Sequence, residues 1–187
     1  MRRLIPDSGQ TTVEQQLDSY RPWEQEREER PFVAMNFAAT ADGRATIGGV
    51  SGPIGSDTDT AMLSGLRKRF DAVMIGAGTM RAERYANLSK RLIVVESGRG
   101  KWADLSELLR SLHGEGVRAV ICEGGPTLHG SLQAAGLVDE LFLTIAPKLT
   151  GSGAPNILEG GLDEVMGLEL LWLLEQDGEL FARYRVR

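Results

Sequence analysis

The sequence of 187 residues lacks the residues on which several classes of protein depend. Its one cysteine, Cys122, excludes an intrachain disulfide and lies in an apolar run, where it is expected to pack rather than react. Its two histidines, His113 and His129, are too few for a histidine-rich metal site, and neither a CxxC nor an HExxH motif is present. We therefore expect no metal centre.

Charge and hydropathy argue against two further classes of partner. The net charge of −5 offers no basic surface to nucleic acid, and no run of 18 apolar residues could span a membrane. Because no secretory signal pattern is present either, the chain is expected to be cytoplasmic. An anionic ligand would have to be held by backbone dipoles and a few cations.

Residues 1–30 differ from the rest of the chain in their density of charge. The run over residues 21–30 holds seven charged side chains, which predicts a solvated polar arm over residues 1–30, followed by one domain over residues 31–187. Val13, Leu17 and Tyr20 stand at helical spacing, so one amphipathic turn of the arm could dock on the domain.

Beyond residue 30, short apolar runs alternate with helical patterns. This alternation predicts an α/β fold with a mixed, mostly parallel sheet and helices on both faces. Asp177-Gly178 between two apolar runs predicts a C-terminal antiparallel hairpin. The predicted strands are 32–39, 72–75, 92–95, 119–122, 139–147, 168–174 and 179–186, and the predicted helices are 57–69, 105–112 and about 126–135.

A glycine turn follows the predicted strand 119–122. The order is Glu123, Gly124-Gly125 and then Pro126, which suits the first position of a helix. Strand, glycine turn and helix N-terminus together form the local geometry that binds phosphate. An ordinary strand-to-helix turn is the alternative, and for this pattern taken alone it is the better interpretation.

A second glycine turn, Gly76-Ala-Gly78, follows the strand 72–75. The dinucleotide fingerprint requires a third glycine at the position of Arg81, so a Rossmann motif is excluded. Thr79 could cap the next helix or bond a ligand. Ligands bind at the carboxyl ends of parallel strands, and polar or glycine residues follow four predicted strands there. We expect these to meet in one cleft: Asp42, 76–79, Glu96 and 123–127.

Four motifs in this order resemble one family, the pyrimidine reductase of riboflavin biosynthesis. They are 36–46 (NFAATADGRAT), 76–79 with Arg81, 123–128 (EGGPTL), and 138–141 with Ala146-Pro147. The family has a dihydrofolate-reductase-like fold and also forms the C-terminal half of a bifunctional deaminase-reductase. The resemblance covers about residues 32–187, and because no zinc deaminase signature is present it is to the reductase half alone. Between Thr79 and Leu92 the chain has 12 residues, where the family normally has a longer stretch.

The resemblance implies an NADPH-dependent oxidoreductase that passes hydride to C1′ of 5-amino-6-(5-phosphoribosylamino)uracil and gives the ribitylamino product. It further implies a homodimer, for which the strand 141–146 and the terminal hairpin are candidate interfaces. The implied catalytic residues are Asp42 and Glu123. The implied cofactor-binding residues are Asn36, Thr46, Gly76, Thr79, Gly124, Gly125, Thr127 and Leu128, and the implied substrate-binding residues are Asn36, Asp42, Arg81 and Glu123.

Alternatives remain open at this point. A related reductase could act on dihydrofolate or another pterin-like substrate, and a non-catalytic nucleotide-binding module could keep the glycine turns. Asp42 together with Asn36 argues against the second alternative, because a simple binder needs no carboxylate at a hydride-transfer site. Asp42 could also be an ordinary turn residue, Arg81 could be exposed, and His129 is expected to pack rather than to transfer protons.

Overall fold

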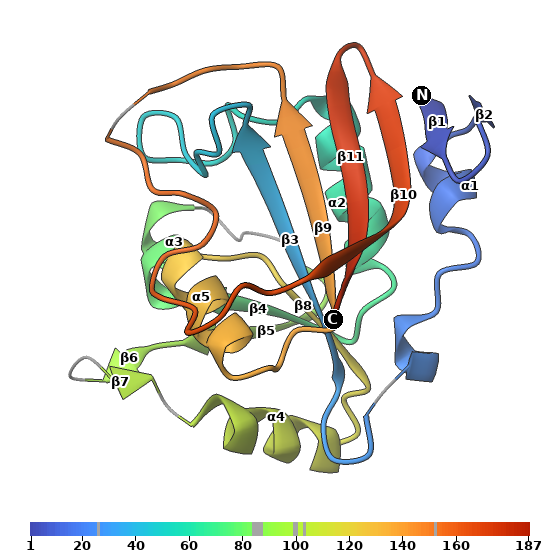
Figure 1. The fold of residues 1–187 in the computed structure, drawn as a ribbon. Coiled ribbons are helices and arrows are strands. Elements are labelled where there is room, and N and C mark those ends of the chain that lie inside the picture. Colours follow the sequence, from blue (N-terminus) through green and yellow to red (C-terminus); the bar gives the residue numbers. More distant parts are fainter. Residues whose placement is uncertain (26, 84–87, 99–100, 103, 152) are drawn as a thin grey trace.

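The computed structural model describes residues 1–25, 27–83, 88–98, 101–102, 104–151 and 153–187 (Figure 1). Nine strands form one sheet in the order β2-β1-β10-β11-β9-β3-β8-β4-β5, and β6 and β7 form a separate pair. The strands are β1 (Arg2–Ile5), β2 (Gly9–Gln10), β3 (Phe32–Thr40), β4 (Ala72–Gly76), β5 (Arg91–Val95), β6 (Ser97–Gly98), β7 (Lys101–Trp102), β8 (Ala119–Cys122), β9 (Glu140–Ala146), β10 (Leu168–Gln176) and β11 (Glu179–Val186).

The sheet is mixed, as predicted, but it is not mostly parallel. Pairing is parallel from β9 through β3, β8 and β4 to β5, and antiparallel from β9 through β11, β10 and β1 to β2. Parallel and antiparallel pairings are therefore equal in number. The prediction missed this balance because β1 and β2 are short and polar and carry no alternating apolar pattern.

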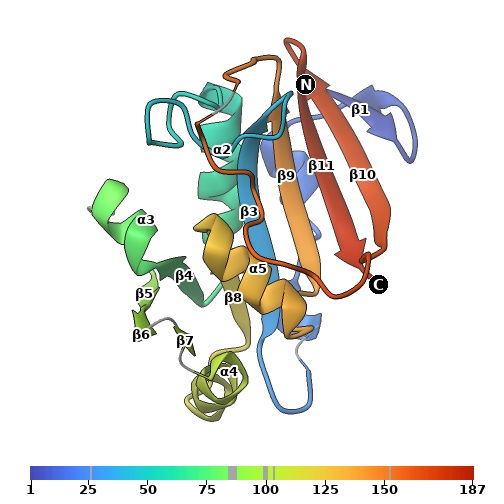
Figure 2. The same cartoon turned by 60° about the vertical axis from the view of Figure 1, so that its left-hand side comes forward.

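Helices cover both faces of the sheet, as the sequence predicted (Figure 2). The short helix α1 (Val13–Leu17) and α2 (Asp57–Arg67) pack on one face, and α4 (Leu105–Gly114) and α5 (Pro126–Ala134) pack on the other. The helix α3 (Ala77–Ala82) directly follows β4. None of the helices in the described part of the chain is long and apolar enough to cross a membrane.

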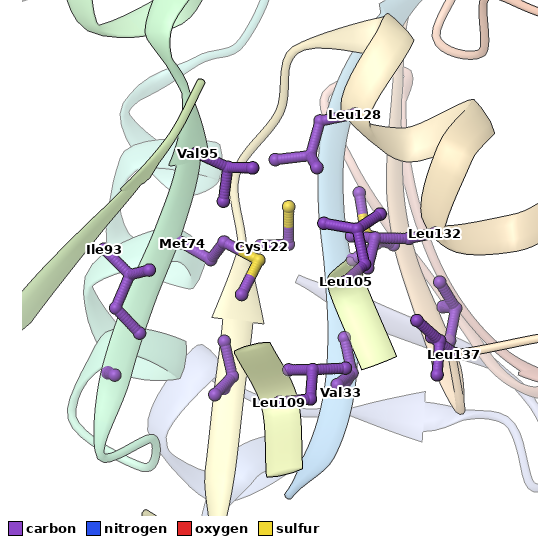
Figure 3. Close-up of a cluster of buried hydrophobic side chains, with 14 of the residues drawn as sticks. Val33, Met74, Ile93, Val95, Leu105, Leu109, Cys122, Leu128, Leu132 and Leu137 are labelled. Carbon is purple, nitrogen blue, oxygen red and sulfur yellow. The ribbon is translucent and has the colours of Figure 1, made fainter. Parts of the chain in front are cut away.

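Alternation along β3 divides the core into two layers. Val33 and Met35 belong to the layer under α4 and α5, and Phe32 and Ala34 belong to the layer under α1 and α2. This is the period of two expected of a strand that is buried on both faces. Figure 3 shows the first layer, in which leucines of α4 and α5 meet side chains of β3, β4, β5 and β8.

The N-terminal segment is more integrated than a solvated arm. The predicted amphipathic turn is α1, and it docks as expected, with Leu17 and Tyr20 buried against Phe70 and Leu66. Beyond that prediction, β1 pairs with β10 and extends the main sheet. A helical turn, η1, covers residues 22–25 before the chain enters β3.

Candidate active site

A cavity of about 440 Å³ opens where β4 and β8 end and α3 and α5 begin. Its volume falls within the range of small-molecule and cofactor sites. Residues of α2 (Asp57–Arg67) and of the loop after β3 also line the cavity. The lining residues include Asn36, Phe37, Ala45, Thr46, Gly49, Ser51, Asp59, Thr60, Leu63, Arg67, Gly76, Thr79, Glu83, Glu123, Gly124, Gly125, Pro126, Thr127 and Leu128.

The two glycine turns contact each other in the wall of this cavity. The Gly76 N–H donates to the Gly124 carbonyl at 2.8 Å. Gly124 has a φ of +106°, which a residue with a side chain rarely adopts. A Cβ built on Gly125 would lie 2.9 Å from Thr79 Oγ1, so a side chain there would push against Thr79. The glycines thus allow a close approach of the two turns and leave backbone exposed to the cavity.

The N-terminus of α5 meets the cavity without a side-chain cap. Its N-cap is Gly125, which has no side chain to accept from the first turn, and Pro126 occupies the first helical position. The backbone N–H groups of Thr127 and Leu128 follow, and both residues line the cavity. Uncapped N–H groups and the positive end of the helix dipole together favour a bound anion such as a phosphate.

Glu123 forms an ion pair with Arg67 at the cavity wall. Arg67 Nε donates to Glu123 Oε1 at 2.7 Å, and its second nitrogen donates to Oε2 at 2.5 Å. The Glu123 side chain is only 5% exposed. Among the described residues that line the cavity, Arg67 is the one cation. The pair therefore fixes the orientation of a guanidinium beside the uncapped helix end.

Sequence reasoning missed Arg67, which lies in the last turn of α2, where a cation is common for its effect on the helix dipole. It also missed Asp59, a second carboxylate of the cavity wall. Asp59 is the third residue of α2, where an acidic side chain is common for its effect on the helix dipole. The Thr144 hydroxyl donates to the Asp59 carboxyl, and burial raises the pKa of Asp59. No signal in the sequence links positions 59 and 144, because they meet only through the sheet.

The loop after β3 is joined to the end of α3 by two residues that line the cavity. The backbone N–H and the hydroxyl of Ser51 both donate to the Glu83 carboxylate, at 2.7 Å and 2.9 Å. Gly49 and Gly52 of the same loop also line the cavity. Ser51 and Glu83 therefore fix this loop at the cavity wall.

Most of the predicted site residues meet at this cavity, and three do not. Residues brought together are Asn36, Thr46, Gly76, Thr79, Glu123, Gly124, Gly125, Thr127 and Leu128. Arg81 is exposed on α3, and Glu96, expected in the cleft, is exposed after β5. Thr79 lies inside α3, whose N-cap is Gly76, so the proposed capping role of Thr79 is wrong.

Asp42 is the third predicted residue that lies outside the cavity lining. Its carboxylate accepts hydrogen bonds from Thr40 Oγ1 at 2.6 Å and from the backbone of Gly151 at 2.8 Å and Thr150 at 3.3 Å. The Thr40 bond, followed by these backbone bonds, lowers the pKa of Asp42. The geometry matches the alternative of a turn residue, because the carboxylate ties the end of β3 to the loop that follows β9.

His129 and Cys122 pack, as predicted. His129 Nδ1 lies 2.8 Å from the Ile157 carbonyl, Nε2 lies 3.1 Å from Gln133 Nε2, and the ring stacks on Phe37. Burial lowers the pKa of His129 and raises the pKa of Cys122 to about 12, so the neutral forms of both are favoured. No cluster of three potential metal ligands occurs in the part of the chain that the structure describes.

Comparison with known proteins places this chain in a family. The family model described as the RibD C-terminal domain matches residues 31–91 and 83–177, in two segments that meet at the short stretch after α3. The 2,5-diamino-6-ribosylamino-4(3H)-pyrimidinone 5′-phosphate reductase of Methanothermobacter thermautotrophicus is 29% identical over 215 residues, covering 84% of this chain and 99% of the relative. The riboflavin biosynthesis protein RibD of Escherichia coli is 47% identical over 68 residues, covering 36% of this chain and 17% of RibD.

A solved structure shows the same fold. The pyrimidine reductase-like protein of Corynebacterium diphtheriae superposes with a TM-score of 0.76 at 22% identity, covering 95% of this chain and 99% of the other. The family match spans most of the sequence and includes both glycine turns that line the cavity. The chain therefore belongs to the RibD C-terminal domain family.

Proposed function

We propose that this chain is a reductase of riboflavin biosynthesis that uses NADPH to reduce 5-amino-6-(5-phosphoribosylamino)uracil at C1′ of its ribose. The observation that carries the proposal is the uncapped N-terminus of α5, which faces the same cavity as a fixed guanidinium and the half-buried carboxyl of Asp59. Family membership supplies the reaction class. The name of the archaeal relative, which is matched over 99% of its length, favours a second candidate substrate, the corresponding 2,5-diaminopyrimidinone.

The residues present fit a phosphorylated nicotinamide cofactor. The α5 N-terminus offers the N–H groups of Thr127 and Leu128 to a pyrophosphate, and the missing side chain of Gly125 lets that anion approach. Asn36, Thr46 and Thr79 add amide and hydroxyl groups to the same cavity. When bound, the reduced nicotinamide supplies hydride, the two-electron reductant of the reaction.

This chain's own residues would bind and orient the substrate. Three carboxylates and one guanidinium line the cavity in its described part, so a substrate phosphate depends on Arg67 and on backbone dipoles. Glu123 keeps the Arg67 guanidinium in place, and Ser51 and Glu83 fix the loop that lines the same cavity. In this proposal Glu123 acts through Arg67 rather than as a proton donor, and Asp42 positions the loop after β9.

The test is oxidation of NADPH, followed by absorbance, with each ribosylaminopyrimidine phosphate and with dihydrofolate. We expect turnover with a ribosylaminopyrimidine phosphate, none with dihydrofolate, and a lower KM for NADPH than for NADH. Turnover of dihydrofolate alone would replace the substrate assignment. Tight NADPH binding without turnover of any of the three would favour a nucleotide-binding module and overturn the proposal.

The proposal also includes a cytoplasmic homodimer. The strand β9 pairs with β3 on one edge and with β11 on the other, so neither edge is open to a second subunit. We therefore propose the outward face of the hairpin β10–β11 as the dimer contact. Light scattering of the purified chain tests this, and a monomer at micromolar concentration would contradict it.

A further inference from the structure

We propose that Asp59 is the catalytic acid of this cavity, which donates a proton to the ribose ring oxygen as the sugar opens for reduction. This inference rests on the proposed function above. Asp59 lines the cavity from the first turn of α2, and residues of both glycine turns and of α5 line the same cavity. Neither the sequence motifs nor the family resemblance pointed to this residue.

The position of the Asp59 carboxyl is fixed by its surroundings. It lies against Gly55, where a built Cβ would be 2.2 Å from Asp59 Oδ2, so the glycine makes room for the carboxyl group. The helix cap is provided by Ser56, whose hydroxyl accepts from the backbone of Thr58 and Asp59. The Asp59 side chain is therefore not used as the cap, and it is held by the hydroxyl of Thr144 on β9.

The three carboxylates of the cavity wall differ in their partners. Glu123 is bound by two nitrogens of Arg67, and Glu83 accepts two hydrogen bonds from Ser51. Asp59 accepts from the neutral Thr144 hydroxyl, and among the described residues it makes no ion pair. A cationic partner would keep a carboxylate ionised, whereas a hydroxyl supports either protonation state. Of the three, Glu123 is paired with a cation and Glu83 with a backbone N–H, which only donates, and among the described residues Asp59 has neither kind of partner.

A second carboxyl lies near Asp59. Glu179 on β11 is 4% exposed and accepts from the Ser56 hydroxyl, and the charge of Asp59 raises the pKa of Glu179. Lys148 offsets part of this charge at Glu179, but its ammonium donates to the carbonyls of Pro53 and Ile54. Burial raises the pKa of both carboxyls, and the raised pKa of Asp59 is the direction a general acid near neutral pH requires.

The step balances with one proton and one hydride. The lone pair of the ribosylamino nitrogen forms a C1′=N bond as the C1′–O4′ bond breaks, and the bond pair moves to O4′. The Asp59 carboxyl gives its proton to O4′ and becomes a carboxylate. Hydride then forms the new C1′–H bond, the C=N pair returns to nitrogen, and water restores the proton to Asp59.

The experiment compares Asp59→Asn with Asp57→Asn across a pH series. Asp57 is an exposed residue of the same helix turn and is not part of the cavity lining, so it controls for charge near the helix end. We expect Asp59→Asn to lower kcat at least tenfold, with NADPH affinity unchanged within threefold and Asp57→Asn close to wild type. In wild type, kcat falls as pH rises through the Asp59 pKa, and this limb should disappear in Asp59→Asn.

Glu179→Gln separates the two neighbouring carboxyls, because the limb assigned to Asp59 should remain in this variant. Three results would overturn the inference while wild-type turnover stands: an Asp59→Asn rate within threefold of wild type, the same pH limb in Asp59→Asn, or loss of the limb in Glu179→Gln alone. If wild type itself turns over no ribosylaminopyrimidine phosphate, the proposed function and this inference both fail.

Discussion

Buried or half-buried carboxyl groups occur at both ends of the parallel strands, and their partners differ. At the amino end of β9, Asp139 accepts from Arg27, from Arg30 and from the backbone of Val33. Its neighbour Glu140 accepts from two nitrogens of Arg183 and from the hydroxyl of Tyr20. At the carboxyl end, Asp59 and Glu179 are held by the hydroxyls of Thr144 and Ser56.

This difference in partners distinguishes carboxylates that stabilise the fold from carboxyls that could exchange a proton. A buried carboxylate with a guanidinium partner stays ionised, and removing one member leaves an unpaired buried charge. When a carboxyl has only a hydroxyl partner, burial destabilises its ionised form, so its protonation state can change within the folded protein. Glu123 lies at the carboxyl end of the parallel strands but is paired with a guanidinium, which is why we assign it to positioning Arg67.

The largest effect is expected from Glu140→Gln. The Glu140 side chain is 2% exposed and that of Arg183 is 18% exposed, so the substitution leaves a mostly buried guanidinium without its carboxylate. We expect the free energy of unfolding to fall by about 3 kcal/mol. Urea unfolding followed by circular dichroism measures this change. Glu169→Gln, which breaks exposed pairs with Arg185 and Arg187, is the control and should stay within about 1 kcal/mol.

Glu123→Gln should have an intermediate effect on stability and a clear effect on binding. Arg67 is 28% exposed, so part of its charge remains solvated after the substitution. We expect a loss of about 2 kcal/mol in unfolding free energy and weaker substrate binding, seen as a raised KM. Glu115→Gln, in the exposed pair with Arg91, is the matched control. A fall in kcat with unchanged KM would instead make Glu123 a reacting group.

Asp59→Asn should raise the free energy of unfolding at neutral pH, whereas Glu140→Gln and Glu123→Gln should lower it. Because the pKa of Asp59 is raised in the folded chain, its ionisation lowers stability as pH rises from the unfolded-state pKa through the folded one. Asparagine removes that loss, so above this window the variant should be more stable than wild type by about 0.5 kcal/mol. Urea unfolding at several pH values tests the sign. A destabilised variant at neutral pH would place Asp59 with the structural carboxylates.

The smallest effect is expected from Asp42→Asn. The pKa of Asp42 is lowered, chiefly by the Thr40 hydroxyl, so its contribution to stability is present above the unfolded-state pKa and is lost as pH falls through the folded one. The variant should unfold at a slightly lower temperature at neutral pH, and its kcat should fall less than tenfold. A tenfold or larger loss of kcat at unchanged stability would return Asp42 to the reacting groups.

The glycine turns illustrate how far the sequence could be interpreted. Their residue types and their places after strands predicted an anion-binding turn at Gly124-Gly125, and the missing glycine at Arg81 correctly excluded a Rossmann motif. The contact between Gly125 and Thr79 was not predictable, because 46 positions separate these residues and β4 and β8 bring them together. Arg67 and Asp59 were missed for the same reason, since each had a sufficient local explanation as a helix-terminal charge.

The sequence by itself determined the alternation of strands and helices, the two-layered core and the glycine turns, because each depends on local periodicity and backbone freedom. The tertiary structure alone decided which charges share a partner and which meet a hydroxyl. That choice depends on strand order and on burial, which together set the desolvation of each carboxyl. It is why Asp42, conspicuous in the sequence, lies in a turn, while Asp59, inconspicuous there, lies in the cavity.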